Sequence, residues 1–317
     1  MLKITILDTC TVTNGDVSLE SIAKLGDVKF YDVIEPEKIP EIIGDSDAVI
    51  CNKAKITKDI MDKCPNLKYV GVFATGYNNI DCEAAKAREI VVCNVPGYST
   101  DSVAQHVFAL LLHFAVNADK YNESVMRGDW MRSKTFSYFA YPLNEISGKT
   151  LGIFGFGTIG KKVCNIALAF GMKVIAVSHK PQTYDGVEFV DKDELFKRSD
   201  YLTLHCPLTE ETKNIVNSDT LSLMKKSAVI INTARGGCID EDALTAALNE
   251  EKIAGAGIDV LDIEPMRDNH PYLTAKNMFI TPHVAWGSFE ARTRLIEKIC
   301  ENVTAFENGA PINVVNK

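Results

Sequence analysis

Three side chains in the C-terminal half of the chain have the types and the setting that an acid–base reaction needs. Arg235 follows an apolar run and precedes two glycines, Glu264 precedes a proline, and His283 follows one. A guanidinium can bind a carboxylate through two parallel hydrogen bonds. An imidazole can transfer a proton, and a neighbouring carboxylate fixes its tautomer and stabilises its protonated form. Taken singly, each residue has an ordinary structural alternative: a surface cation, a turn, or a satisfied histidine.

A glycine-rich turn upstream predicts a dinucleotide site. A strand pattern leads into it and a helical pattern follows it, and its residues are Gly155-Phe156-Gly157-Thr158-Ile159-Gly160. The first glycine allows a tight turn, the second lets a pyrophosphate approach, and the third lets the helix lie close to the strand. The N-terminus of the helix offers N–H groups to the phosphates. The alternative is a turn that contains three convenient glycines.

The end of the next expected strand bears on the choice between NAD and NADP. An acidic residue at this place binds the ribose 2′-hydroxyl of NAD. Here the strand ends in Ser178-His179-Lys180 and no acid is present. The serine can bind a hydroxyl or a phosphate, and the two basic residues can pair with a 2′-phosphate. The missing acid slightly favours NADP, while the alternative for the basic pair is a solvated loop.

Length and composition indicate a folded protein of about two domains. The chain has 317 residues, of which 46% are hydrophobic and 24% charged, and its net charge is −8. This acidity argues against a nucleic-acid or membrane surface, which needs clustered Lys and Arg. The N-terminus has no signal-peptide pattern and no apolar run is long enough to span a membrane. The nine cysteines form no CxxC pair, so we expect reduced thiols, no metal site and a cytoplasmic protein.

The elements that must position these residues follow an α/β pattern. Short apolar runs alternate with helical patterns, which is typical of βαβ units with buried parallel strands. The expected strands are Lys3–Asp8, Ala48–Asn52, Tyr69–Thr75, Val91–Val95, Thr150–Phe154, Lys173–Ser178, Tyr201–Cys206, Ala228–Ala234, Ala254–Val260 and Met278–Pro282. Two long helices, near 102–121 and 288–306, divide the chain. We therefore predict a dinucleotide-binding domain at residues 100–286 and a second domain formed by residues 1–99 and 287–317.

The order and spacing of the motifs resemble the D-isomer-specific 2-hydroxyacid dehydrogenase family over essentially the whole chain. The matching segments are Gly155–Gly160, Asn232–Gly237, Asp259–Val260 with Glu264–Pro265, and Pro282–His283. The resemblance implies two Rossmann-like domains with parallel sheets, of which the substrate domain is flavodoxin-like. It implies Arg235 as the substrate anchor and His283, paired with Glu264, as the acid and base. It also implies cofactor contacts from Val103, His205, Pro207, Thr233, Ala234 and Asp259, the last at the nicotinamide carboxamide.

Further segments resemble the glycerate dehydrogenase and hydroxypyruvate reductase branch. They are Asn52-Lys53, Ala74–Asp81, Ser99–His106 and Pro282–Trp286. We expect the amides of Thr75 and Gly76 to form a small nest for the substrate carboxylate, and Trp286 to contact the substrate. The alternative for the first segment is an ordinary turn in which Asp81 caps the following helix.

The expected activity is therefore NAD(P)-dependent hydride transfer between a small 2-keto acid, hydroxypyruvate or glyoxylate, and its D-2-hydroxy acid. The alternatives are a reductase for a bulkier 2-keto acid and a D-3-phosphoglycerate dehydrogenase, which needs more cations and usually a regulatory extension. An NAD(H)-sensing corepressor-like binding protein is the alternative outside the enzymes, and the missing long polar tail argues against it. The helix at 102–121 and the aromatic segment up to Tyr141 resemble the family's dimerisation arm, which implies a homodimer.

Overall fold

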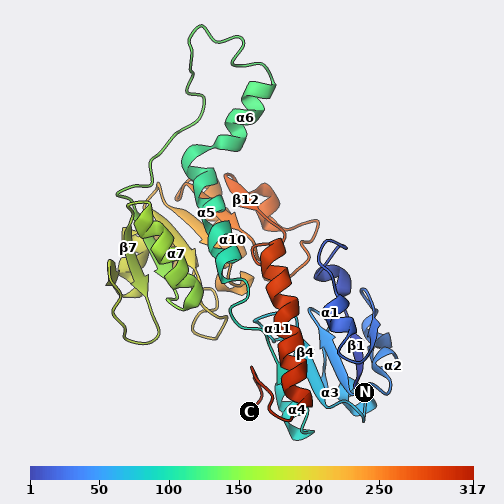
Figure 1. Ribbon diagram of the computed structural model, residues 1–317. Helices are drawn as coiled ribbons and strands as arrows, with labels where there is room; N and C mark the ends of the chain where they lie inside the picture. Colours follow the sequence, from blue (N-terminus) through green and yellow to red (C-terminus); the bar gives the residue numbers. More distant parts are fainter. The chain divides into compact units, whose positions relative to one another are not determined.

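The computed structural model describes residues 1–317, which form two compact units (Figure 1). The first unit comprises residues 1–99 and 286–317, and the second comprises residues 100–285. Trp286 thus lies in the first unit, one residue away from the expected boundary. Its ring lies 6.2 Å from that of Tyr98 in an edge-on contact, so local packing explains the difference.

The first unit contains a parallel sheet with the strand order β2-β1-β3-β4-β5. The strands are β1 (Lys3–Ile6), β2 (Asp27–Phe30), β3 (Ala48–Cys51), β4 (Tyr69–Val72) and β5 (Val91–Cys93). Its helices are α1 (Glu20–Ala23), α2 (Ile39–Ile43), α3 (Lys58–Lys63), α4 (Cys82–Ala87) and α11 (Phe289–Glu307), with short 3₁₀ turns η1 (Thr9–Thr11) and η2 (Pro36–Lys38). Successive residues of β3 face two separate apolar clusters. Ala48 and Ile50 pack in one cluster, and Val49 and Cys51 pack in the other. This strand order is the flavodoxin-like one.

The second unit contains a parallel sheet with the order β12-β11-β10-β9-β6-β7-β8. Its strands are β6 (Thr150–Phe154), β7 (Lys173–Val177), β8 (Val187–Phe189), β9 (Tyr201–Leu204), β10 (Val229–Asn232), β11 (Gly255–Ile258) and β12 (Met278–Ile280). The order reverses between β6 and β9, and ligands of such sheets bind at the carboxyl ends of the strands beside this reversal. The prediction of two Rossmann-like parallel sheets, the first flavodoxin-like, is confirmed.

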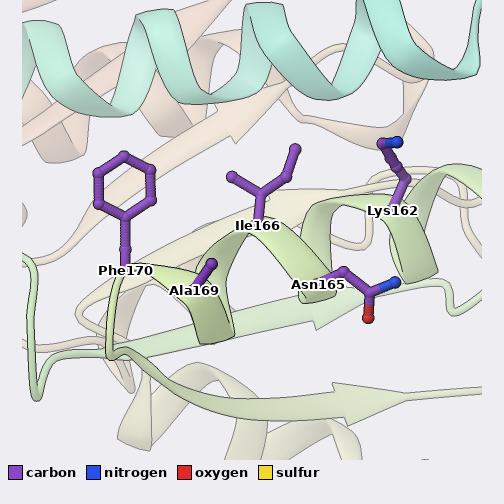
Figure 2. Close-up of a pocket in the computed structure, with 5 residues that line it drawn as sticks. All are labelled: Lys162, Asn165, Ile166, Ala169 and Phe170. Carbon is purple, nitrogen blue, oxygen red and sulfur yellow. The ribbon is translucent and has the colours of Figure 1, made fainter.

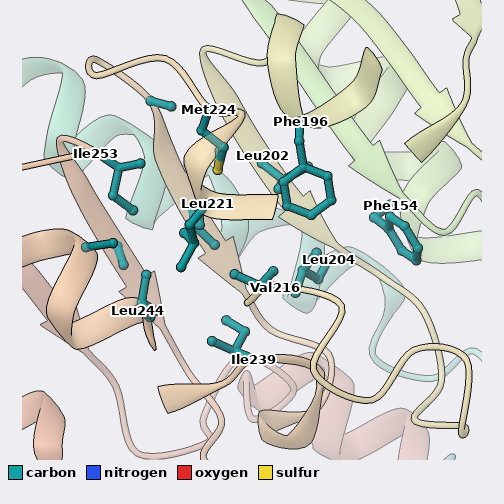
Figure 3. Packing of buried hydrophobic residues seen from close by; sticks show 14 of the residues in the cluster. Phe154, Phe196, Leu202, Leu204, Val216, Leu221, Met224, Ile239, Leu244 and Ile253 are labelled. Atoms are coloured by element: carbon teal, nitrogen blue, oxygen red, sulfur yellow. The ribbon is translucent and has the colours of Figure 1, made fainter. Parts of the chain in front are cut away.

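Helices cover both faces of the second sheet. The helices of this unit are α5 (Thr100–Val116), α6 (Ala118–Met126), α7 (Thr158–Ala169), α8 (Lys192–Arg198), α9 (Ser218–Ser222) and α10 (Glu241–Asn249), with 3₁₀ turns η3 (Gly236–Cys238) and η4 (Pro271–Thr274). Of these helices, α6 stands away from the sheet (Figure 1). Figure 3 shows one of the two apolar layers, in which Leu202 and Leu204 of β9 pack beside Phe196 of α8. Each of these three side chains is fully buried. Truncating a leucine in such a core to alanine costs about 2–5 kcal/mol.

Three elements differ from the expected pattern. The helix expected at 102–121 is two helices, because Asn117 between α5 and α6 adopts a left-handed φ of 48°. Asparagine tolerates this conformation, and its Nδ2 donates to the carbonyl oxygen of Pro142 at 2.9 Å. The edge strands β2 and β8 were not predicted.

Other features of the chain concern membranes, thiols and metals. No helix has both the length and the apolarity to cross a bilayer. All nine cysteines are free thiols, and Cys10 is the exposed one among them. No group of three or more His, Cys, Asp or Glu side chains is arranged to hold a metal ion.

Candidate active site

The glycine turn after β6 combines two close packing contacts with one open position. Gly155 has a φ of 97°, and a Cβ there would lie 2.7 Å from the backbone of His205. A Cβ on Gly160 would lie 2.4 Å from the carbonyl oxygen of Gly155. A Cβ on Gly157 would meet nothing within 4 Å. The first and third glycines are therefore needed by the packing of the turn itself, whereas the second leaves a cradle that fits a pyrophosphate.

Helix α7 begins at Thr158 with Gly157 as its N-cap, and no side chain caps its first N–H groups. An uncapped N-terminus with its positive dipole end is suited to a phosphate. Ile159 packs partly buried against the apolar layer below. The ring of Phe156 is also buried, 5.2 Å from the rings of Tyr184 and Phe189. Phe156 can therefore offer a ligand only its backbone.

The carboxyl end of β7 carries the predicted ribose contacts. His179 and Lys180 are exposed, and Ser178 is half-buried. The Oγ of Ser178 accepts a hydrogen bond from Nε2 of Gln182, a residue that the sequence interpretation missed. Gln182 is a polar amide four residues beyond Ser178, and its spacing alone does not reveal that it turns back. The two side chains together present hydrogen-bond donors where an acid is absent.

The strand ends beside the glycine turn carry further predicted cofactor contacts. His205 follows β9, and burial lowers the pKa of its imidazole to about 3, so the ring is neutral at physiological pH. Its Nε2 lies 3.0 Å from Oγ1 of Thr203. The Oγ1 of Thr233 is buried and has no hydrogen-bond partner, which is costly unless a ligand supplies one. The remaining predicted contacts are an exposed Pro207, a half-buried Ala234 and a buried Val103 on α5.

Arg235 is held in place by a buried asparagine that the sequence interpretation did not single out. Asn232 ends β10 and is fully buried. Its Nδ2 donates to the carbonyl oxygen of Arg235 at 2.9 Å, and its Oδ1 accepts from the amide of Ala234 at 3.0 Å. Nη1 of the half-buried Arg235 donates to the carbonyl oxygen of Ala234 at 2.6 Å. The other N–H groups of the guanidinium form the part that can bind an anion.

The glycines after Arg235 allow another segment to cross directly against this turn. We call residues Leu261–Pro265 the strap. A Cβ on Gly236 would lie 1.8 Å from the carbonyl carbon of Leu261 and 2.1 Å from the amide nitrogen of Asp262. Only glycine permits this approach. This contact places the segment that carries Glu264 against the backbone that follows Arg235.

Glu264 and His283 form the pair that the sequence predicted. Nδ1 of His283 lies 2.7 Å from Oε2 of Glu264, and Oε1 of Glu264 accepts from the amide of Leu261 at 3.0 Å. The side chains of His283 and Glu264 are 27% and 32% exposed, so both remain accessible to a ligand. With Nδ1 bonded to the carboxylate, Nε2 is the atom that can exchange a proton with a bound molecule.

Asp259 fixes the loop that carries His283. His283 has a left-handed φ of 54°, which costs about 1–3 kcal/mol in a non-glycine residue. The Asp259 carboxylate is 1% exposed. One oxygen accepts from Oγ1 of Thr281 at 2.6 Å and from the amide of Val284 at 2.9 Å, and the other accepts from the amide of Ala285 at 2.9 Å. Its predicted contact with the nicotinamide carboxamide stays a prediction, and the structure adds this positioning role.

The predicted substrate residues other than Arg235 belong to the first unit. Oγ1 of Thr75 donates to the carbonyl oxygen of Val95 at 2.9 Å, beyond the end of β4, and Gly76 is half-buried. Asp81 caps α4 by accepting from the amide of Ala84 at 2.9 Å. Trp286 is half-buried against an apolar cluster of this unit. These contacts account for the local turn, and a role of Thr75, Gly76 or Trp286 toward substrate stays a prediction.

Comparisons with known proteins place this arrangement in a family. Residues 108–285 match the model described as "D-isomer specific 2-hydroxyacid dehydrogenase, NAD binding domain". The chain is 40% identical over 322 residues to a hydroxypyruvate reductase of Blautia hydrogenotrophica, covering 100% of both chains. It is 44% identical over 282 residues to a glycerate dehydrogenase of Methylorubrum extorquens, covering 88% of each.

A solved structure supports the same placement. The chain resembles an acyclic imino acid reductase in complex with NADPH and D-Arg, with a TM-score of 0.88 and 35% identity, covering 99% of this chain and 100% of the other. The family model covers more than half of the chain, and the match with the Blautia relative is full-length. The chain therefore belongs to the D-isomer specific 2-hydroxyacid dehydrogenase family.

Proposed function

We propose that this D-2-hydroxyacid dehydrogenase reduces hydroxypyruvate to D-glycerate and glyoxylate to glycolate. The observation that carries the proposal is the 2.7 Å contact between His283 and Glu264. Glu264 lies on the strap, which crosses against the turn of Arg235. Relatives named hydroxypyruvate reductase, glycerate dehydrogenase and glyoxylate reductase support the choice of small substrates.

The residues of the second unit would bind a dinucleotide and direct the reaction as follows. The Gly155–Gly160 turn and the N-terminus of α7 fit the pyrophosphate, and Thr233 supplies a buried hydroxyl that lacks a partner. When bound, the reduced nicotinamide supplies the hydride. Arg235 binds the substrate carboxylate through its guanidinium. Nε2 of His283 donates a proton to the carbonyl oxygen, while Glu264 holds Nδ1 and so the orientation of the ring.

For the cofactor we propose a preference for NADPH. An aspartate at the end of β7 would repel a 2′-phosphate, whereas Ser178 and Gln182 offer donors, with Lys180 beside them. The test is a side-by-side measurement of kcat/KM with NADPH and with NADH. Hydroxypyruvate is the substrate, and the oxidation of the cofactor is monitored by its absorbance at 340 nm. We expect NADPH to be favoured at least about tenfold, which corresponds to ~1.4 kcal/mol. An equal or greater kcat/KM with NADH would refute the preference without affecting the acid–base assignment.

The catalytic assignment is tested with His283→Ala. General acid catalysis contributes ~10²–10⁴-fold, so we expect kcat for hydroxypyruvate to fall by that factor. The affinity for NADPH, measured by its fluorescence on binding, should stay close to that of the wild type. The control is Lys192→Ala, which alters an exposed residue of α8 outside the site and should leave kcat unchanged. A His283→Ala enzyme with near-normal turnover would show that another group donates the proton.

We also propose that the chain forms a homodimer through the second unit. Helix α6 and the segment after it stand away from the rest of this unit (Figure 1). Four large side chains here are 79–91% exposed, namely Met126, Met131, Phe136 and Phe139. A hollow of about 420 Å³ is lined by side chains of α7 and by Phe170, which is 44% exposed. Figure 2 shows Ile166 and Phe170 among these lining residues. Large apolar side chains exposed in this way on a protruding segment are typical of an interaction site.

Sedimentation velocity tests the dimer. The wild type should sediment at twice the mass of 34.9 kDa, and Phe136→Asp combined with Phe139→Asp should sediment as a folded monomer. A monomeric wild type would refute the proposal. We place this enzyme in the reducing cytoplasm, which suits nine free thiols.

A further inference from the structure

A carboxylate outside every motif connects the strap to a buried histidine. Glu241 is the first residue of α10, where Asp240 is the N-cap. Its Oε1 accepts a hydrogen bond from the backbone amide of Asp262 at 3.0 Å. Its Oε2 lies 3.1 Å from Nε2 of His270, and the two side chains are 19% and 7% exposed. One carboxylate thus holds two groups on the segment that follows β11.

The tautomer of His270 follows from its other nitrogen. Nδ1 accepts a hydrogen bond from the backbone amide of Tyr272 at 3.2 Å, so Nδ1 carries the lone pair. The neutral ring then carries its hydrogen on Nε2. Nε2 is buried and forms no hydrogen bond of regular geometry, although Oε2 of Glu241 lies 3.1 Å away, and a buried N–H without an acceptor is costly. The carboxylate of Glu241 is the group placed to compensate it, and the ring cannot reverse its tautomer without losing the amide of Tyr272.

Other contacts also hold the strap, and the Leu261 side chain packs against an apolar cluster of this unit. The backbone of the strap touches Gly236, and Leu261 donates to Glu264 itself, within the strap. The bond from Asp262 to Glu241 is therefore a link between the strap and a helix, made two residues before Glu264. His270 in turn fixes the position of the Glu241 carboxylate. A shift of Asp262 would be passed along two peptide units to the Glu264 carboxylate that meets His283.

We propose that Glu241 and His270 are positioning residues that hold the strap so that Glu264 meets His283. This inference rests on the proposed acid–base function of that pair. Neither residue contacts the pair directly in the structure, so both act through the strap. The effect should appear in kcat, because the chemical step depends on the orientation of His283. The KM for NADPH should change little, because the glycine turn is unaffected.

The test is a double-mutant cycle with Glu241→Gln and Glu264→Gln. The side-chain oxygen of a glutamine at 241 can still accept a hydrogen bond from the amide of Asp262. Its NH₂ group then faces the Nε2–H of His270, so that two hydrogen-bond donors face each other. We expect kcat to fall by at least about tenfold in the wild-type background, since a displacement of about 1 Å can cost 10²-fold. In the Glu264→Gln background the same change should have almost no effect, because the carboxylate to be positioned is gone.

Asp242→Asn is the matched control, because it removes the same charge from the exposed next residue of the same helix turn. It should leave kcat unchanged. Glu241→Asp is the second variant, to be used if the glutamine variant fails to fold. It keeps the charge at the helix N-terminus, but the aspartate side chain is too short to reach both Asp262 and His270. A fall in kcat of equal size in both backgrounds would overturn the inference while leaving the proposed function standing. An unchanged kcat in Glu264→Gln alone would overturn the proposed function as well.

Discussion

Replacing Gly236 with alanine is the smallest change that should separate the acid–base pair. The added methyl would lie 1.8 Å from the carbonyl carbon of Leu261, whereas ordinary contact begins at 3.4 Å. The overlap of about 1.6 Å is with backbone and cannot be relieved by a side-chain rotation. The strap must therefore move away from the turn of Arg235.

The structure gives the expected size of this effect. The Glu264–His283 contact is 2.7 Å and the Asp262–Glu241 bond is 3.0 Å, so a shift of more than 1 Å breaks or distorts both. Misplacement of about 1 Å can cost 10²-fold in rate, and overpacking of this kind costs ~1–3 kcal/mol in stability. We expect kcat for hydroxypyruvate to fall by about 10²-fold in a protein that still folds.

The assay is steady-state reduction of hydroxypyruvate at 340 nm, together with thermal unfolding and NADPH binding. Gly237→Ala is the matched control, because the atoms nearest to its Cβ would be the ends of the Asp262 and Leu208 side chains, at 2.9 and 3.0 Å. It should keep most of its activity. If Gly236→Ala retained a normal kcat and a normal unfolding temperature, the strap would not be fixed as described and the reasoning would be wrong.

Three other changes test separate parts of the structure. Gly157→Ala should leave stability unchanged, because its Cβ meets no protein atom within 4 Å, but should raise the KM for NADPH; a lower unfolding temperature would contradict this. Asp259→Asn should lower stability by ~1–3 kcal/mol and reduce kcat, since the new amide group faces the N–H of Ala285; chemical denaturation measures the first effect. Ellman's reagent at pH 8 should label Cys10 at once and the buried thiols only after unfolding, because burial raises the pKa of Cys164 to about 11.

Most of the strands that the sequence predicted are fully or largely buried, although the predicted edge strand β12 is only half-buried. Ala48–Cys51 is buried at every position, so its letters form an unbroken apolar run. The edge strand β2 (Asp27–Phe30) is mostly exposed, with Asp27 and Lys29 in it, and β8 (Val187–Phe189) has only three residues. Edge strands keep polar residues because one side faces water, and such segments resemble loops in the sequence.

The candidate site was predictable where the demands on the residues are local. A glycine such as Gly155 is required by the conformation of its own turn, so its motif can be read without the fold. Arg235 and His283 stand just past strand ends, a place that the alternation of elements reveals. Glu241 stands between two other acidic residues, Asp240 and Asp242, at the start of a helix. Only the fold shows which of the three carboxylates faces the strap.

Transfer of deuterium tests the central claim most directly. The wild-type enzyme is incubated with hydroxypyruvate and NADPH that carries deuterium at both positions of C4 of the nicotinamide, and the product is analysed by NMR and by separation of its enantiomers. Hydride transfer to C2, with the proton supplied by His283, predicts D-glycerate with one deuterium at C2. L-Glycerate as the product, or glycerate without deuterium at C2, would contradict the account.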